Sequence, residues 1–232
     1  MPEYNVGDLG RIELLRDLSK SVLSDTAKSC RWRSYSANEQ IIDRQSEATE
    51  VFFVVEGRVR VVNYSISGRE ITLDDVDAGG HFGELAAIDG EPRSASVMAL
   101  TYCSVAIMAQ DNFLGLVNEN SNIALKVMRG LASIIRNSTD RIMDLSTLAA
   151  NNRVQADLLR LALNNRNSNN TACLSPIPVH ADIASRVSTT RETVARVMNH
   201  LARQGILERK KNLLMIHDLQ LLQKMVEEIR GE

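Results

Sequence analysis

The sequence predicts an α+β chain with a β jelly roll, a long helix and a C-terminal winged helix-turn-helix domain. Short β-branched runs alternate with glycine turns between Arg31 and Met108, a spacing typical of an antiparallel sandwich. From about Asp111 the hydrophobic period becomes helical, and residues 122–150 contain no proline. Residues 179–216 then read as two short helices followed by a hairpin. The predicted domains cover residues 1–121, 122–150 and 151–232.

Composition narrows the class of protein. The 232 residues are 44% hydrophobic but only 4% aromatic, which predicts aliphatic cores. No window approaches the eighteen or more apolar residues of a membrane span. The first ten residues, MPEYNVGDLG, lack the basic-then-apolar pattern of a signal peptide. We therefore expect a cytoplasmic protein with no membrane partner.

Cysteine and histidine spacing argues against a metal cofactor. The cysteines are far apart and form no CxxC pair: Cys30, Cys103 and Cys173. Free buried thiols are the expectation, and an iron–sulfur cluster needs about four clustered thiolates. The histidines show no metal-ligand spacing: His81, His180, His200 and His217. The sequence predicts neither a metal site nor an iron–sulfur cluster.

In the N-terminal half, residues 11–30 are predicted to form a short amphipathic helix. Strand-like runs follow at 51–57, 59–64 and 66–73, and then in SASVMAL and CSVAIM. Ser67 and Gly68 form a hairpin turn between two of these runs. Val59 and Val61 alternate with Arg60, as in a half-exposed strand.

The run FGELAAIDGEPRSAS at 82–96 carries the first candidate site. Glu84 lies nine residues before Arg93, which Ser94 follows. A cyclic nucleotide needs a guanidinium, a hydroxyl and backbone N–H groups for its phosphate, and a carboxylate can accept from its ribose 2′-hydroxyl. Glu84 and Arg93 could supply both kinds of partner. The alternative is an exposed Glu–Arg pair around a turn.

Residues 122–150 are predicted to form a dimerisation helix. Its apolar stripe follows alternating spacings of three and four residues, which predicts a coiled-coil seam in a parallel homodimer. The alternative is that the stripe packs on the sandwich of its own subunit. The seam positions are Met128, Leu131, Ile135, Ser138, Ile142, Leu145 and Ala149.

Ser138 interrupts this seam, with Thr139 beside it. A hydroxyl there either fixes the register or meets a polar ligand. Residues 147–153 are predicted as a hinge, residues 153–165 as a helix, and residues 164–178 as a loop ending in two prolines.

Residues 179–204 predict the helix-turn-helix. A first helix over His180–Arg186 precedes a turn at Val187 and Ser188. Thr189 is the expected N-cap of the second helix, with Glu192 completing a capping box, and this helix runs to about Arg203. Four small apolar residues are placed to pack the two helices together: Ala184, Val187, Val194 and Val197.

Charge gathers in the same part of the chain. Residues 153–217 hold ten Lys/Arg against four Asp/Glu, although the net charge of the whole chain is -2. Guanidinium groups on a recognition helix suit guanine edges, and a carboxylate suits cytosine N4. Residues 205–216 read as a wing with basic residues at its tip for phosphates. An ordinary αα-hairpin with a surface Glu–Arg pair is the alternative. The candidate DNA contacts are Thr190, Arg191, Glu192, Arg196, Arg209, Lys210 and Lys211.

Two strings carry a family resemblance. FGEL followed by RSA resembles the phosphate-binding cassette of cyclic-nucleotide-binding domains, and TTRETVARVMNHL resembles a bacterial recognition helix. The chain resembles the cAMP receptor protein and fumarate–nitrate reduction regulator family over nearly its full length. The resemblance implies a dimeric transcription regulator that binds palindromic DNA with TGTGA-like half-sites when a cyclic nucleotide is bound. RNA polymerase is an expected partner.

The resemblance also implies residue roles. Glu84 accepts from the ribose, and Arg93 and Ser94 hold the cyclic phosphate. Ser138 reaches the purine from its own subunit and Thr139 from the partner. Arg191, Glu192 and Arg196 read bases. Backbone N–H groups assist at Gly83, Leu85 and Ala95.

Two departures affect the ligand. The cassette connection is one residue shorter than in the enteric cAMP receptor protein, and Asp74 falls in the strand where that protein has a serine facing the purine. An acidic group there accepts from an amino-bearing base, so we expect cAMP with cGMP as a second ligand.

The sequence offers less support for an enzyme, or for a protein that does not respond to a ligand. No Ser/His/Asp or Cys/His set and no phosphate-binding GxxxxGK[ST] loop is present, so an enzyme is not expected. A regulatory module acting on protein partners, or a constitutive DNA-binding protein with a vestigial pocket, are the alternatives.

Overall fold

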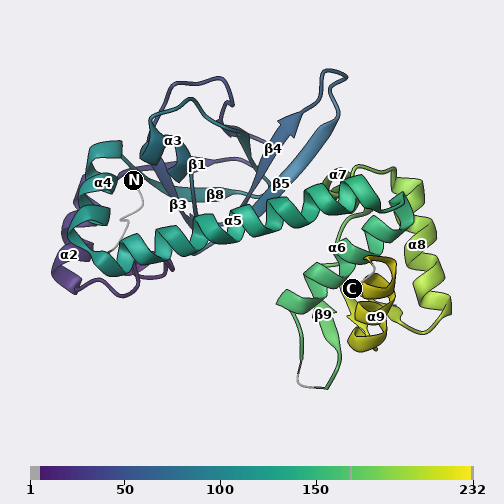
Figure 1. Ribbon diagram of the computed structural model, residues 1–232. Helices are drawn as coiled ribbons and strands as arrows, with labels where there is room; N and C mark the ends of the chain where they lie inside the picture. The colour runs from purple at the N-terminus through teal and green to yellow at the C-terminus, as the bar shows by residue number, and fades with distance from the viewer. Residues whose placement is uncertain (1–5, 168, 231–232) are drawn as a thin grey trace. The chain divides into compact units, whose positions relative to one another are not determined.

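The computed structural model describes residues 6–167 and 169–230. The chain divides into two compact units, Met1–Ile134 and Ile135–Glu232, and the boundary falls inside one long helix, α5 (Ser121–Thr147) (Figure 1). Each unit has its own hydrophobic core. The mixed α+β class expected from the sequence is confirmed.

The first unit is a sandwich of two four-stranded antiparallel sheets, in the orders β1-β8-β3-β6 and β2-β7-β4-β5. The predicted jelly-roll sandwich is thus observed. Its strands are β1 (Arg31–Tyr35), β2 (Gln40–Ile42), β3 (Val51–Glu56), β4 (Arg58–Tyr64), β5 (Glu70–Asp77), β6 (His81–Phe82), β7 (Ser96–Ala99) and β8 (Cys103–Met108).

Strand β3 shows why this sheet is buried on both faces. Phe52 and Val54 pack between the two sheets, while Val51 and Phe53 belong to a second core that includes residues of the flanking helices. Successive side chains of a strand point to opposite faces, so the apolar run fills both cores. The helices of the unit before α5 are α1 (Val6–Leu9), α2 (Lys20–Ser29), α3 (Glu84–Asp89) and α4 (Gln110–Glu119).

Helix α5 has two apolar faces. Ile123 and Val127 are buried in the core of the first unit, whereas most of the predicted seam is exposed. Leu131 is the exception, because it packs partly against that core. Whether this stripe pairs with a second copy or packs on its own sandwich stays a prediction. The exposed seam residues are Met128 (57%), Ile135 (65%), Ile142 (63%) and Leu145 (45%).

The end of α5 corrects two sequence expectations. Ala149 is not a seam residue, because α5 ends at Thr147 and Ala149 is the N-cap of the next helix. That helix, α6, runs from Ala150 to Asn164. The interruption is therefore confined to Leu148 and Ala149, narrower than the hinge predicted over residues 147–153.

The second unit is a winged helix-turn-helix. One prediction was wrong: the supposed loop 164–178 contains a strand, β9, which pairs with the wing to complete a three-stranded sheet. Its three residues are too short a run for strand periodicity to identify. The elements after α6 are β9 (Ala172–Leu174), α7 (His180–Arg186), α8 (Arg191–Arg203), β10 (Leu207–Lys210), β11 (Leu213–Ile216) and α9 (Leu219–Arg230).

The N-cap of α8 is Thr190, not Thr189 as the sequence suggested. The Thr190 hydroxyl accepts from the backbone N–H of Thr193 at 3.2 Å. The N–H of Thr189 donates instead to the Ala184 carbonyl at 3.0 Å, so Thr189 belongs to the turn. A capping box that pairs Thr189 with Glu192 is excluded by this shift of one residue.

Replacing Thr190 with alanine should therefore loosen the start of α8. Loss of an N-cap costs about 1 kcal/mol, which corresponds to roughly fivefold faster amide exchange in the first turn. Hydrogen exchange of the α8 peptide in the full chain measures this effect. Thr189→Ala is the matched control, and an equal acceleration in both variants would contradict the cap assignment.

Candidate functional site

The cassette begins where β6 ends. Gly83 follows Phe82 with φ 85°, and Gly90 ends the short helix α3 with φ 74°. Both angles lie in the left-handed region that glycine adopts without steric cost. The chain then returns through Arg93 to β7, so the two glycines bring Arg93 back beside the start of α3.

Arg93 is the buried centre of this connection, with a side chain only 3% exposed. Its Nη1 donates to the Gly83 carbonyl at 2.8 Å, and its Nη2 donates to the Glu50 carbonyl at 2.7 Å. The Glu50 carboxylate lies 3.6 Å from Nη2. The guanidinium also lies over the Phe52 ring, 5.7 Å from its centroid, within cation–π range.

One donor of this guanidinium has no partner. The Nε of Arg93 is buried without a hydrogen bond to any described residue. Burial lowers the pKa of Arg93, while Glu50 and Glu84 act in the opposite direction. The alternative of an exposed Glu84–Arg93 pair is wrong because Arg93 is buried and its salt bridge within the described chain is to Glu50.

The other cassette residues surround Arg93 in sequence with different exposures. Glu84 and Leu85 are half-buried in the first turn of α3, Ser94 is exposed, and Ala95 is buried. Asp74 is exposed on β5 and paired with Val61. Its carboxylate accepts from the backbone N–H of Asp75 at 2.9 Å.

Sequence reasoning missed two polar residues near the cassette. Glu50, the residue immediately before β3, contacts Arg93. Asn63 on β4 donates through Nδ2 to the Ser94 carbonyl at 3.4 Å. The sequence did contain one signal for Asn63: it is a polar residue on a strand face whose other members, Val59 and Val61, are apolar.

Ser138 and Thr139 lie in the exposed part of α5. The Thr139 hydroxyl donates to the Ile135 carbonyl at 3.0 Å, which is ordinary back-bonding within a helix. These two residues belong to the second unit and the cassette to the first. Their contribution to the same ligand site stays a prediction.

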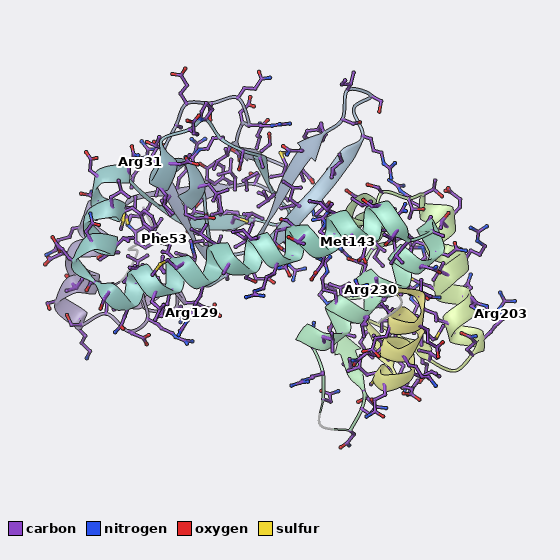
Figure 2. All side chains as sticks on the ribbon, viewed as in Figure 1. Arg31, Phe53, Arg129, Met143, Arg203 and Arg230 are labelled. Carbon is purple, nitrogen blue, oxygen red and sulfur yellow. The ribbon has the colours of Figure 1, made fainter. Side chains whose placement is uncertain are left out.

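In the helix-turn-helix, the predicted packing of α7 on α8 is confirmed, because Ala184, Val187, Val194 and Val197 are buried in one cluster. The opposite face of α8 is exposed. It carries Arg191, Glu192 and Arg196, and Asn199 and Arg203 extend it by two turns. Figure 2 shows Arg203 projecting outward from the end of this helix.

Three of the ten basic residues counted in this region support the fold. Arg153 donates to the carbonyls of Leu148 at 2.8 Å, Val187 at 2.9 Å and Ser188 at 3.1 Å, which holds the turn between α7 and α8. Asp157, with a side chain 2% exposed, pairs with Arg186 at 2.9 Å and also with Arg160. The net charge of the segment therefore overstated the cations available to DNA.

The wing carries three basic residues, and the charge of one of them is partly neutralised by a neighbouring carboxylate. Arg209 is exposed, whereas Lys210 lies 3.0 Å from Glu208. Lys210 and His217 both lower the pKa of Glu208. Of the three basic residues expected at the tip of the wing, only Lys211 lies in the turn between β10 and β11, with φ 36°. Arg209 and Lys210 belong to β10.

Two of the three cysteines, Cys30 and Cys103, are buried as expected, whereas Cys173 is half-buried. Cys30, Cys103 and Cys173 are free thiols, and burial raises the pKa of Cys30 to about 11. Across residues 6–167 and 169–230, no three His, Cys, Asp or Glu side chains gather as a metal site. Over the same residues, no helix has the length and apolar character needed to cross a membrane.

Both parts of this arrangement match known family models. Residues 32–120 match the cyclic nucleotide-binding domain, and residues 152–225 match the Crp-like helix-turn-helix domain. The chain belongs to the CRP/FNR family of transcription regulators. CRP-like regulators join the same two domains in this order, and the helix-turn-helix marks the chain as a DNA-binding protein.

Individual relatives have low sequence identity to this chain, but the matches cover most of both chains. The cAMP-activated global transcriptional regulator Vfr of Pseudomonas aeruginosa is 28% identical, covering 81% of this chain and 89% of its own. The cyclic AMP receptor protein of Thermus thermophilus is 27% identical, covering 83% and 87%.

Solved structures agree on the fold. A CooA mutant from Carboxydothermus hydrogenoformans superposes with a TM-score of 0.80 over 97% of each chain, at 24% identity. A CRP/FNR-family transcriptional regulator from Thermus thermophilus superposes with a TM-score of 0.60 at 27% identity, covering 85% of this chain and 98% of its own.

The contacts of Arg93 with Gly83 and Glu50 predict how much a substitution at Gly83 destabilises the fold, and Gly90 offers a matched control. A Cβ at Gly83 would lie 2.8 Å from Arg93 Nη1 and 2.9 Å from the Glu50 carbonyl, whereas a Cβ at Gly90 has nothing within 4 Å. Both positions carry the left-handed penalty of about 1–2 kcal/mol. We expect Gly83→Ala to lower the free energy of unfolding by at least about 1 kcal/mol more than Gly90→Ala, because only Gly83→Ala displaces the guanidinium.

Urea unfolding followed by the fluorescence of the single tryptophan, Trp32, reports on the first unit. Equal destabilisation by the two substitutions would show that the contacts of Arg93 do not constrain this turn.

Proposed function

We propose that this protein is a cyclic-nucleotide-responsive dimeric regulator that binds palindromic DNA when its ligand is bound. The observation that carries the proposal is the buried guanidinium of Arg93, which keeps one unpartnered donor inside the cassette. The same chain carries an exposed, arginine-bearing recognition helix. A buried cation for an anion and a DNA-reading helix in one chain fit a ligand-controlled repressor or activator.

The proposed ligand is cAMP, with cGMP as a second ligand. Arg93 and Ser94 hold the cyclic phosphate, assisted by backbone N–H groups at Gly83, Leu85 and Ala95, and Glu84 accepts from the ribose. A guanidinium in a buried site binds phosphate more strongly than it does in water. The printed names of the relatives Vfr and cyclic AMP receptor protein support cAMP.

Asp74 supports cGMP as the second ligand. It pairs with Val61 across β4 and β5, and its carboxylate could accept a hydrogen bond from the amino group of a purine. Ser138 is proposed to reach the purine from its own subunit, and Thr139 from the partner.

The exposed seam of α5 supports the homodimer. Ile135 and Ile142 are each more than 60% exposed, and a stripe this narrow is stabilised in water by pairing with a second copy. In this proposal residues 1–121 bind the nucleotide, residues 122–150 dimerise and residues 151–232 bind DNA. The dimer acts in the cytoplasm, with RNA polymerase as its further partner.

Nucleotide and DNA should bind cooperatively. Ligand contacts on α5 bias the pairing of the two dimer helices, and this pairing sets the separation of the recognition helices. Since coupling between two sites is reciprocal, operator DNA should raise cAMP affinity by the factor by which cAMP raises operator affinity. Calorimetric titration of cAMP with and without a palindromic TGTGA-containing duplex measures this factor, which we expect to be about 5–150.

Arg93→Ala is the diagnostic variant for this experiment. Truncating a buried charge partner costs about 2–5 kcal/mol, so cAMP affinity should fall more than tenfold while Arg16→Ala, at an exposed arginine, leaves it unchanged. Circular dichroism checks that both variants fold. A wild-type factor of one would instead favour a constitutive DNA-binding protein.

The recognition helix and the wing should differ in what they read. Arg196, exposed on α8 and 3.2 Å from the Asn151 side chain, is proposed to contact a guanine edge, while Thr190, Arg191 and Glu192 contact neighbouring groups. Arg196→Ala should cost about 1–3 kcal/mol and relax specificity at one G·C pair.

Arg209→Ala should weaken all sequences alike and reduce the salt dependence of binding, as expected for a wing that also offers Lys210 and Lys211 to phosphates. Arg203→Ala, at the far end of α8, is the control and should change little. Binding to a panel of single-substituted operators at several salt concentrations separates these effects. A uniform loss across the panel for Arg196→Ala would remove its base-reading role.

A further inference from the structure

Asn63 occupies an unusual place on the inner face of the sandwich. Val59, Val61 and Asn63 share one face of β4, because alternate residues of a strand point the same way. Val59 is buried in the core between the two sheets, and the partly buried Val61 packs against that core. Asn63, paired with Ile71 of β5, therefore continues an apolar row with a polar amide.

One end of this amide is attached to the cassette. Its Nδ2 donates to the Ser94 carbonyl at 3.4 Å, at the long end of the range for such bonds. This bond also sets the orientation of the amide, so that Oδ1 points elsewhere. Oδ1 is buried and has no hydrogen-bond partner among the described residues.

A buried acceptor without a partner is rare in a native protein and calls for an explanation. A purely structural role does not explain it, since valine fills the same face at positions 59 and 61 without any polar atom to satisfy. The hydrogen bond from Nδ2 to Ser94 does not satisfy Oδ1, so the cost of burying this oxygen is not offset.

The described chain contains four such orphan atoms, and two of them touch the cassette. Arg93 Nε is an unpartnered donor and Asn63 Oδ1 is an unpartnered acceptor. Arg93 contacts Gly83, and Asn63 contacts Ser94, so both side chains are attached to the same connection. The other two atoms belong to Ser104 on β8 and Gln155 on α6.

The two orphans are chemically complementary to different parts of one ligand. The oxygens of a cyclic phosphate diester accept hydrogen bonds and have no proton to donate at neutral pH. They can satisfy Arg93 but not Asn63. The Asn63 acceptor needs an O–H or N–H group, and a cyclic nucleotide carries these on its ribose and on its base.

We infer that Asn63 is a further nucleotide-contacting residue, whose amide oxygen accepts a hydrogen bond from a hydroxyl or N–H group of the bound cyclic nucleotide. Its amide nitrogen holds the Ser94 carbonyl, which fixes the acceptor relative to the cassette. The inference rests on the proposed nucleotide site and adds a residue that selects among nucleotides.

The test compares ligand pairs that differ by one donor group, in the wild-type protein and in Asn63→Val. The pairs are cAMP with 2′-deoxy-cAMP, cAMP with purine riboside 3′,5′-cyclic monophosphate, and cGMP with cIMP. The first pair removes the ribose hydroxyl, and the other two remove the amino group of adenine or guanine. Valine suits this face of the strand, and Trp32 fluorescence checks that the variant folds.

We expect the wild type to lose about tenfold in affinity when the donor recognised by Asn63 is removed, the usual scale for one hydrogen bond. In Asn63→Val the same removal should change affinity less than twofold. A ratio within each protein cancels any uniform loss caused by a looser fold. The pair that shows this coupling identifies the ribose or the base as the donor.

Equal losses in the two proteins for all three pairs overturn the inference while leaving the nucleotide site intact. Absence of binding by the wild type to cAMP, cGMP and every analogue overturns the proposed function, and the inference with it. These outcomes are distinct because the first requires measurable wild-type affinity.

Discussion

The seating of Arg93 is the constraint on which the rest of the ligand site depends. A guanidinium that is 3% exposed has to be surrounded by acceptors, and here two backbone carbonyls, from Gly83 and Glu50, supply them. The left-handed turn at Gly83 and the start of β3 are thereby fixed to one side chain. The cassette is ordered by the same group that is proposed to receive the phosphate, so the site is held in place before any ligand arrives.

Helix α5 uses its two faces for two purposes. Ile123 and Val127 anchor its beginning in the core of the first unit, while Ile135 and Ile142 remain exposed further along. Exposed apolar stripes of this kind commonly mark a surface that contacts another molecule, and the proposed dimer would cover it. In that proposed dimer Ser138 would lie within the covered surface, where its hydroxyl would either fix the register or contact the ligand.

Much of the architecture was predictable because its signals are local. The β-branched runs of the sandwich, the period of α5, and the limits of α7 at His180 and Arg186 follow from side-chain periodicity. The cap at Thr190 was missed by one residue because two adjacent threonines offer the same hydroxyl. Strand β9 was missed because its three residues become a strand only through pairing with Leu214 and Ile216. The partners of Arg93 and the orphan oxygen of Asn63 depend on tertiary contacts, which no spacing in the sequence encodes.

Arg153 has a mechanical consequence. Its single guanidinium grips the carbonyl of Leu148, at the interruption after α5, and the carbonyls of Val187 and Ser188, in the turn before α8. Two backbone segments that are about forty residues apart in sequence are thus hydrogen-bonded to one planar group whose geometry is rigid. We therefore expect a rotation of the last turn of α5 to move the start of the recognition helix with it, because one side chain holds both segments. Arg153 would in this way couple α5 to the recognition helix although it is not among the proposed ligand or base contacts.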